Sequence, residues 1–136
     1  MANVFTTQIL EEGPRNVVMK LVGVLDTSNQ SAVLAVDLST LNQGGTGPTP
    51  TGVRIDMVDY SISDQLQVQF LWDATTDVVA LALVGREDMN FKGFGGVNNN
   101  AGAGKTGNIL ITTTGYTSGT QVYTIVLQMV KQGPSL

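Results

Sequence analysis

The chain has 136 residues, a net charge of −4 and a charged fraction of 13%, about half of the ~25% that is typical of soluble domains. This length fits one domain with a single core, and the seven scattered basic residues argue against nucleic acid or an anionic membrane as partners, because both are bound by clustered basic side chains. Cys and His are absent, which excludes disulfides, thiolate or imidazole metal ligands, and Ser-His-Asp or Cys-His catalytic groups.

Residues 1–15 precede the first predicted strand and end at a Gly-Pro-Arg sequence. Proline limits regular structure at this point, so we interpret the segment as an extended N-terminal arm that lies outside the first hairpin. The arm carries the apolar side chains Phe5, Ile9 and Leu10, and it ends at Arg15. An arm with apolar side chains is expected to dock on another protein surface.

Segments with strand character follow one another from residue 16 to residue 132, and none has a sustained helical stripe. Residues 65–73 alternate polar and apolar side chains, and residues 52–62 place Val53, Ile55 and Met57 on one face. The eight predicted strands are residues 16–26, 31–36, 52–62, 65–73, 78–85, 89–94, 108–114 and 121–132. Short strands with turn-forming residues between them predict an all-β fold, an antiparallel β-sandwich or a jelly-roll-like barrel.

The loop at residues 96–108, GVNNNAGAGKTGN, ends in letters that resemble a phosphate-binding loop. In the pattern G-x-x-x-x-G-K-[ST], however, Asn99 occupies the position of the first glycine, and the following segment is rich in β-branched residues instead of beginning a helix. We therefore interpret it as a docking loop that allows another chain to approach closely. Its candidate contact residues are Asn98, Asn99, Asn100 and Lys105, of which the lysine is expected to meet a carboxylate.

Three strands are apolar on both faces, unlike the strands of an ordinary sandwich. Residues 78–84 do not alternate, residues 17–24 carry valines on both faces, and the last strand places Val122, Val126 and Val130 opposite its main apolar face. Leaving ~100–200 Å² of such surface in water would forgo several kcal/mol per strand at about 25 cal/mol per Å². We expect either a further layer within the monomer or a subunit interface to cover these faces.

Carboxylates and aromatic residues are the remaining candidates for chemistry. Asp56 and Asp59 are three apart in a strand and so point to opposite faces unless a bulge intervenes. Asp73 and Asp77 bracket a turn, where they form an Asx turn or, with further oxygen ligands, a Ca²⁺ site. Trp72 continues an apolar face and is expected to pack in the core. No set of residues meets the geometry of an active site, so we expect no catalytic residue, metal site, cofactor or small-molecule substrate.

Four segments of the chain carry a family resemblance: QILEEGPRNVVMKLVGVLD, VRIDMVDYSI, LWDATTD, and FGGVNNNAGAGKTGNILITTTG followed by YTIVLQMVKQ. The chain resembles small virion structural proteins encoded by tailed bacteriophages, and the likeness covers most of its length. The resemblance implies an all-β protein that cements or decorates an icosahedral head. Such proteins bind as a trimer or dimer across junctions between major capsid subunits and bring no catalytic residues.

These observations give one set of expectations. The chain is divided into an arm at 1–15, a β-sandwich domain at 16–131 and a short tail at 132–136. Its expected partners are the major capsid protein and further copies of itself, with a trimer favoured over a dimer. Its expected place is the outside of the virion capsid, after synthesis in the host cytoplasm. The alternatives are a tail, neck or fibre component of the virion, or a carbohydrate-binding module that uses Trp72, Tyr60 or Tyr116.

Overall fold

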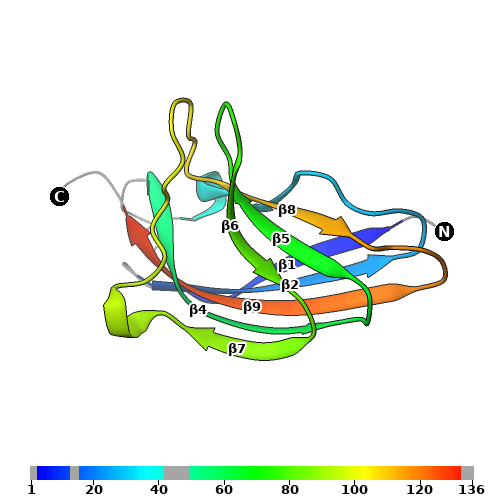
Figure 1. The fold of residues 1–136 in the computed structure, drawn as a ribbon. Helices are drawn as coiled ribbons and strands as arrows, with labels where there is room; N and C mark the ends of the chain where they lie inside the picture. The colour runs from blue at the N-terminus through cyan, green and yellow to red at the C-terminus, as the bar shows by residue number, and fades with distance from the viewer. Residues whose placement is uncertain (1–2, 13–15, 42–49, 133–136) are drawn as a thin grey trace.

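The computed structural model describes residues 3–12, 16–41 and 50–132, which fold into two antiparallel β-sheets packed face to face (Figure 1). Sheet A has the strand order β1 (Val4–Glu12), β2 (Asn16–Leu25), β9 (Gln121–Gln132), β4 (Gly52–Ile62) and β7 (Arg86–Asn90). Sheet B has the order β3 (Val33–Val36), β8 (Ile109–Thr114), β5 (Gln67–Trp72) and β6 (Val78–Leu83). The predicted all-β sandwich is confirmed, with nine strands in the described part of the chain.

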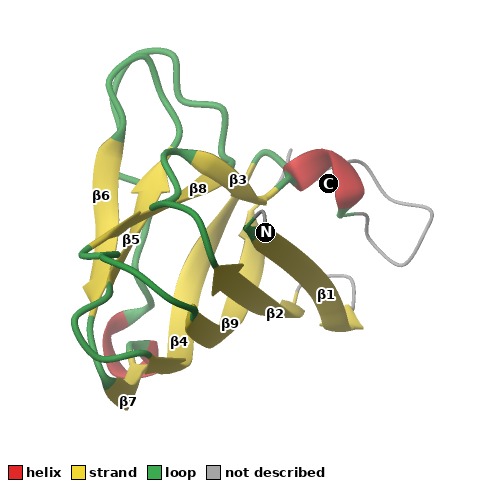
Figure 2. Cartoon of the chain, turned by 90° about the vertical axis from the view of Figure 1, so that its right-hand side faces the viewer, coloured by secondary structure: helices red, strands yellow, loops and turns green. Residues whose placement is uncertain are grey.

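Two short helical turns lie in the connections between strands. Both are 3₁₀ turns, Leu38–Thr40 after β3 and Lys92–Phe94 after β7, and Figure 2 shows them at the margins of the two sheets. Over the described ranges, no helix has the length and apolar character that a membrane span requires.

The core lies between the two sheets and is built from alternate residues of each strand. In β2 the inward side chains are Val17, Met19 and Leu21, and in β9 the inward row runs from Tyr123 to Met129. Trp72 of sheet B is 1% exposed and belongs to the same core, which confirms its predicted packing role. The inward apolar residues of β2, β4, β5, β8 and β9 are therefore removed from water by the opposite sheet.

A β-bulge in β4 reverses the two faces that strict alternation predicts for the second half of that strand. The pairing of β4 with β9 shifts register between Ile55 and Met57, so Asp56 is the extra residue. Val58 then lies fully buried in the core, whereas Met57 is only partly buried. Strict alternation places Met57 inward, and that prediction is wrong because one inserted residue reverses the faces that follow it.

The N-terminal segment is an edge strand, so the predicted free arm is not confirmed. Residues Val4–Glu12 form β1, which pairs with β2 in antiparallel register from Val4↔Val24 to Glu12↔Val17. Phe5 faces the core side and its ring centroid lies 6.4 Å from that of Tyr123. Arg15 lies outside the described residues. β1 thus extends sheet A instead of standing apart from it.

The chain between β6 and the second 3₁₀ turn also differs from prediction. The sequence predicts strands at residues 78–85 and 89–94, but β6 ends at Leu83, and β7 begins at Arg86 and ends at Asn90. Gly85, with φ 73°, lies in the two-residue link by which the chain crosses from β6 to β7, and glycine adopts this left-handed conformation without steric cost. The charged sequence Arg86–Asp88 then forms an edge strand, where charged side chains oppose unwanted pairing with other chains.

Tyr123 makes a polar contact inside the core. Its hydroxyl donates a hydrogen bond to Oε1 of Gln30, and both residues are buried. Burial raises the pKa of Tyr123 well above its ordinary value, and the hydrogen bond with Gln30 lowers that pKa by a smaller amount. The folded protein therefore holds this phenol in its neutral form.

This burial predicts a loss of stability in alkali. Because the pKa of Tyr123 is raised on folding, its contribution is complete below the unfolded pKa of about 10 and is lost as pH rises above it. The free energy of unfolding, measured by urea titration from pH 8 to 11, is expected to fall above pH 10 by up to about 1.4 kcal/mol per unit from this residue. Tyr123→Phe is expected to remove this part of the fall, and Tyr116→Phe to keep it; equal slopes in both variants would contradict the prediction.

Candidate docking surfaces

The loop at residues 96–108 is a defined structure that packs on two other parts of the sandwich. Val97 forms a two-way backbone bridge with Ile55 of β4, with N···O distances of 2.7 and 3.0 Å. Further along, Thr106 donates from its hydroxyl to the Asp73 carboxylate at 2.9 Å, and a backbone bond joins Thr75 to Ala103 at 3.2 Å. The loop is followed by strand β8, as predicted, and not by a helix.

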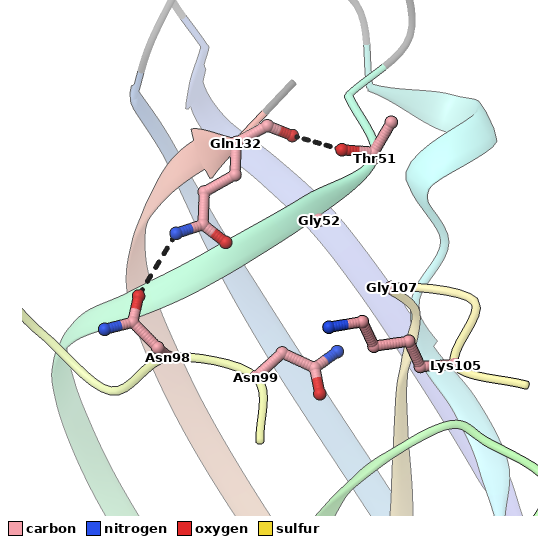
Figure 3. Close-up of a pocket in the computed structure, with 7 residues that line it drawn as sticks. All are labelled: Thr51, Gly52, Asn98, Asn99, Lys105, Gly107 and Gln132. Atoms are coloured by element: carbon pink, nitrogen blue, oxygen red, sulfur yellow. Dashed lines mark hydrogen bonds between the residues drawn. The ribbon is translucent and has the colours of Figure 1, made fainter. Parts of the chain in front are cut away.

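The same loop forms one wall of a polar pocket beside the start of β4 and the end of β9. The pocket has a volume of about 430 Å³, and Figure 3 shows its seven lining residues. They are Thr51, Gly52, Asn98, Asn99, Lys105, Gly107 and Gln132. Three of the four loop residues predicted to make contacts are thereby brought together, whereas Asn100 is exposed and does not line this pocket.

The pocket presents hydrogen-bond donors and one positive charge. Asn98 Oδ1 accepts from Gln132 Nε2 at 3.1 Å and Asn99 Oδ1 accepts from the Ala101 amide at 2.9 Å, which leaves both asparagine Nδ2 groups as donors. The Lys105 side chain points toward Asn99 across the pocket (Figure 3), and over the described ranges no ion pair engages it. None of the described residues that line the pocket is a carboxylate, so the pocket suits a carboxylate group of another molecule.

The three apolar residues predicted in the arm have different surroundings in β1. Phe5 is partly buried against the core, so it is a packing residue and the prediction that it docks elsewhere is not supported. Ile9 is 37% exposed and Leu10 is 49% exposed, the latter at a register shift between Ile9 and Glu11. Of the three predicted residues, Ile9 and Leu10 are therefore the two that stay exposed at the edge of sheet A.

The three valines predicted as an interface lie on the outer face of sheet A. Val122 is 46% exposed and Val126 is half-buried, but Val130 is 7% exposed. Val130 stands between Asn16 of β2 and Arg54 of β4 in the strand register. It is thus mostly covered within the monomer, and its prediction as an exposed contact is wrong.

The outer face of sheet B contains an apolar row that the sequence pattern alone does not identify. Phe70 and Trp72 of β5 point into the core, so Leu71 between them points outward. Register aligns Leu71 with one aliphatic residue on each of the other three strands, giving the row Leu34, Leu110, Leu71 and Val79. The two end residues are 43% and 50% exposed. The unbroken apolar run of β6 is the available signal, but the partners on β3 and β8 require the register.

Sheet B also carries no charge. None of its four strands contains Asp, Glu, Lys or Arg, whereas every strand of sheet A contains at least one. The neighbours of the apolar row are uncharged, since Gln69 pairs with Thr112 and Ala82 beside it. Uncharged amides and hydroxyls cost less to desolvate than ions, so this face is the part of the sandwich best suited to close contact with another protein.

The aspartates that the sequence singled out either accept hydrogen bonds from nearby residues or lie exposed on the surface. Asp77 accepts a hydrogen bond from the Ala74 amide at 3.0 Å, so it binds a backbone amide of the turn, although this bond runs back three residues and differs from the predicted Asx turn. Asp56, at the bulge, accepts from Arg54 Nε at 2.9 Å, while Asp59 lies exposed on the outer face of sheet A. Within the described part of the chain, no group of three or more acidic side chains is placed to hold a metal ion.

No known family model matches this chain, and no curated protein matches its sequence.

Proposed function

We propose that the chain is a non-enzymatic structural protein of a phage virion, which binds the outside of the head as a homo-oligomer and stabilises junctions between major capsid subunits. The resemblance of its sequence to small virion proteins supports the virion setting. The uncharged outer face of sheet B, with its row of four aliphatic residues, supports a role in protein contact. That face is the observation that carries the proposal.

The energetics of such a face suit a cement protein. Covering a further ~40 Å² on each of the four aliphatic residues contributes about 1 kcal/mol apiece at 25 cal/mol per Å². A single contact of this size is weak, but an oligomer that engages several equivalent sites on a symmetric shell gains avidity. The donor-rich pocket at Lys105 adds a site for a capsid carboxylate, and such charged contacts set register and orientation.

The alternative of a carbohydrate-binding module loses one of its three aromatic candidates. Trp72 is 1% exposed, and a buried ring cannot stack on a sugar. Tyr116 is partly buried and donates its hydroxyl to the Gly119 carbonyl at 2.7 Å. Tyr60 is partly covered and lies beside Glu87 and Asp88 at a shallow hollow. The alternative is therefore carried as an outcome of the binding test, as is a position on the tail, neck or fibre.

The test uses heads of the phage that encodes this chain, prepared with a stop codon in its gene. Purified protein is mixed with these heads, and its binding is followed by cosedimentation and by cryo-electron microscopy. We expect ordered density on the outer surface of the head. Leu34→Lys combined with Val79→Lys is expected to weaken binding about tenfold or more, because two charges must then be desolvated at the contact.

The matched control is Phe94→Lys, which places a lysine at a residue that is 73% exposed in the second 3₁₀ turn. It is expected to bind heads as the unaltered protein does. Equal thermal midpoints for all three proteins would show that the fold is intact. Density on tails or fibres instead of heads, or binding only to a glycan array, would overturn the proposal.

A further inference from the structure

The outer face of sheet A has a charge pattern that the strand register makes visible. One row of neighbours crosses all five strands, and it consists of Gln8, Lys20, Val126, Asp59 and Asp88. The inward residues of β2 and β9 alternate with these positions and are buried, so this row points away from the core. β9 lies at the middle of the sheet, with β2 on one side and β4 on the other.

In this row, the two charged residues next to β9 have opposite signs, and each lies one strand away from β9. Lys20 is one strand from Val126 on one side, and Asp59 is one strand from it on the other. With strands about 4.8 Å apart, their backbones are separated by about 10 Å. Over the described ranges, neither residue forms an ion pair. Asp59 instead faces Asp88 directly across the β4–β7 pair, an arrangement of like charges that destabilises a sheet.

Two copies of this face are complementary when a two-fold axis runs parallel to β9 and lies in the plane between the two facing sheets. The rotation exchanges the two sides of β9, so Lys20 is placed opposite the partner subunit's Asp59, and Asp59 opposite the partner subunit's Lys20. Val126 and Val122 on β9 meet the same residues of the other copy. In the next row, Val18 and Met57 flank β9 in the same way, so these apolar side chains also face each other.

We propose that a second copy of this chain packs on the outer face of sheet A about this axis, forming a two-fold dimer with two Lys20–Asp59 ion pairs between subunits. The five strands, five to twelve residues long, span about 24 by 30 Å, or roughly 700 Å². Stable interfaces cover about 800 Å² on each partner. Two sheets stacked about 10 Å apart with nearly aligned strands is a common packing in proteins.

The charge pattern also decides which partner this face accepts. Each copy carries a net charge of −4, so contact between copies is opposed unless opposite charges meet. The exchange of Lys20 and Asp59 provides that match, and it gives the Asp59–Asp88 pair a cation. Sheet B has no charged side chain in its strands and so no comparable pattern. The inference rests on the proposed function only for taking an oligomer as the working form, and it assigns that form a two-fold dimer.

The test is a charge swap read by sedimentation velocity and light scattering on the full chain. The unaltered protein is expected to be a dimer, and Lys20→Asp and Asp59→Lys are each expected to raise the dissociation constant about tenfold or more, because each places like charges opposite one another. An equimolar mixture of the two variants is expected to dimerise again, since the introduced aspartate then meets the introduced lysine, and the retained Asp59 meets the retained Lys20. The doubly substituted chain is expected to do the same.

Two charge reversals away from this face serve as matched controls. Lys105→Asp in the polar pocket and Asp64→Lys in the turn between β4 and β5 are expected to leave the dimer unchanged. A monomer or trimer for the unaltered protein, or a mixture that stays as dissociated as its components, would overturn the inference. These outcomes are distinguishable from head binding: a monomer that binds heads overturns the dimer and the oligomeric form but leaves the head-binding role, whereas a dimer that binds no heads overturns the proposed function alone.

Discussion

Replacing Gly23 by alanine is expected to lower the free energy of unfolding by about 3 kcal/mol, the upper range for overpacking a core. Gly23 of β2 pairs with Tyr123 of β9, and Phe5 of β1 completes the same row on the inner face. A Cβ at position 23 would lie 2.3 Å from two ring carbons of Tyr123. The ring occupies the space that the glycine leaves open, a recognised way to support a glycine within a sheet.

Displacing the Tyr123 ring would itself be destabilising, because the residue is fully buried and its hydroxyl donates a hydrogen bond to Gln30. Urea denaturation measures the effect, and Gly102→Ala is the matched control because nothing lies within 4 Å of a Cβ there; we expect that variant to stay within about 0.5 kcal/mol. Combined with Tyr123→Ala, Gly23→Ala is expected to cost less than it does alone. A Gly23→Ala protein as stable as Gly102→Ala would show that the contact is not tight.

Replacing Glu12 by glutamine is expected to cost about 2–3 kcal/mol, because it removes the carboxylate that faces a buried ammonium. Lys131 Nζ lies 2.7 Å from Glu12 Oε2, and the lysine side chain is 1% exposed while that of Glu12 is 19% exposed. The ion pair joins β1 to β9 across the intervening β2. It therefore ties the N-terminal edge strand to the middle of sheet A, in addition to the backbone bonds with β2.

The control variants separate charge from packing. Glu11→Gln, on the exposed neighbour of Glu12, is expected to change stability by no more than about 0.5 kcal/mol. Lys131→Met keeps most of the side-chain volume without the charge, so the double variant with Glu12→Gln is expected to be more stable than Glu12→Gln alone. Hydrogen exchange in β1 is expected to quicken in Glu12→Gln. The idea fails if Glu11→Gln and Glu12→Gln are equally destabilised.

Much of the fold was predictable because strands have a recognisable local pattern. Alternation located β5 and the apolar face of β9, and Gly and Asp residues marked most turns. The errors fell where a local pattern has two structural outcomes. The bulge at Asp56 reversed the faces of the second half of β4. The amino-acid pattern of this strand does not distinguish a bulged residue from one that continues the regular alternation. Residues 4–12 were assigned to an arm because Gly13-Pro14 suggested an end, whereas β1 pairs with β2 on either side of those positions.

The candidate surfaces were predictable only in part. Residues 96–108 form a loop as predicted, because Gly and Asn tracts between apolar runs form loops, and Asn98, Asn99 and Lys105 line one pocket. Its other wall comes from Thr51 and Gln132, which are far away in the sequence. Val122 and Val126 were correctly placed opposite the core face, while Val130 is covered by its surroundings. Pairing partners decide such coverage, and they are not encoded in any single segment.

Composition and period-2 alternation are local properties, so the amino-acid sequence was enough to establish a one-domain all-β chain with few charges. The identity of neighbouring strands came only from the folded structure, because most consecutive strands cross between the two sheets and pairing depends on the packing of the whole core. The apolar row from Leu34 to Val79 and the opposed charges of Lys20 and Asp59 exist only through that order. Their residues are distant in sequence, and strand register alone brings them onto one surface.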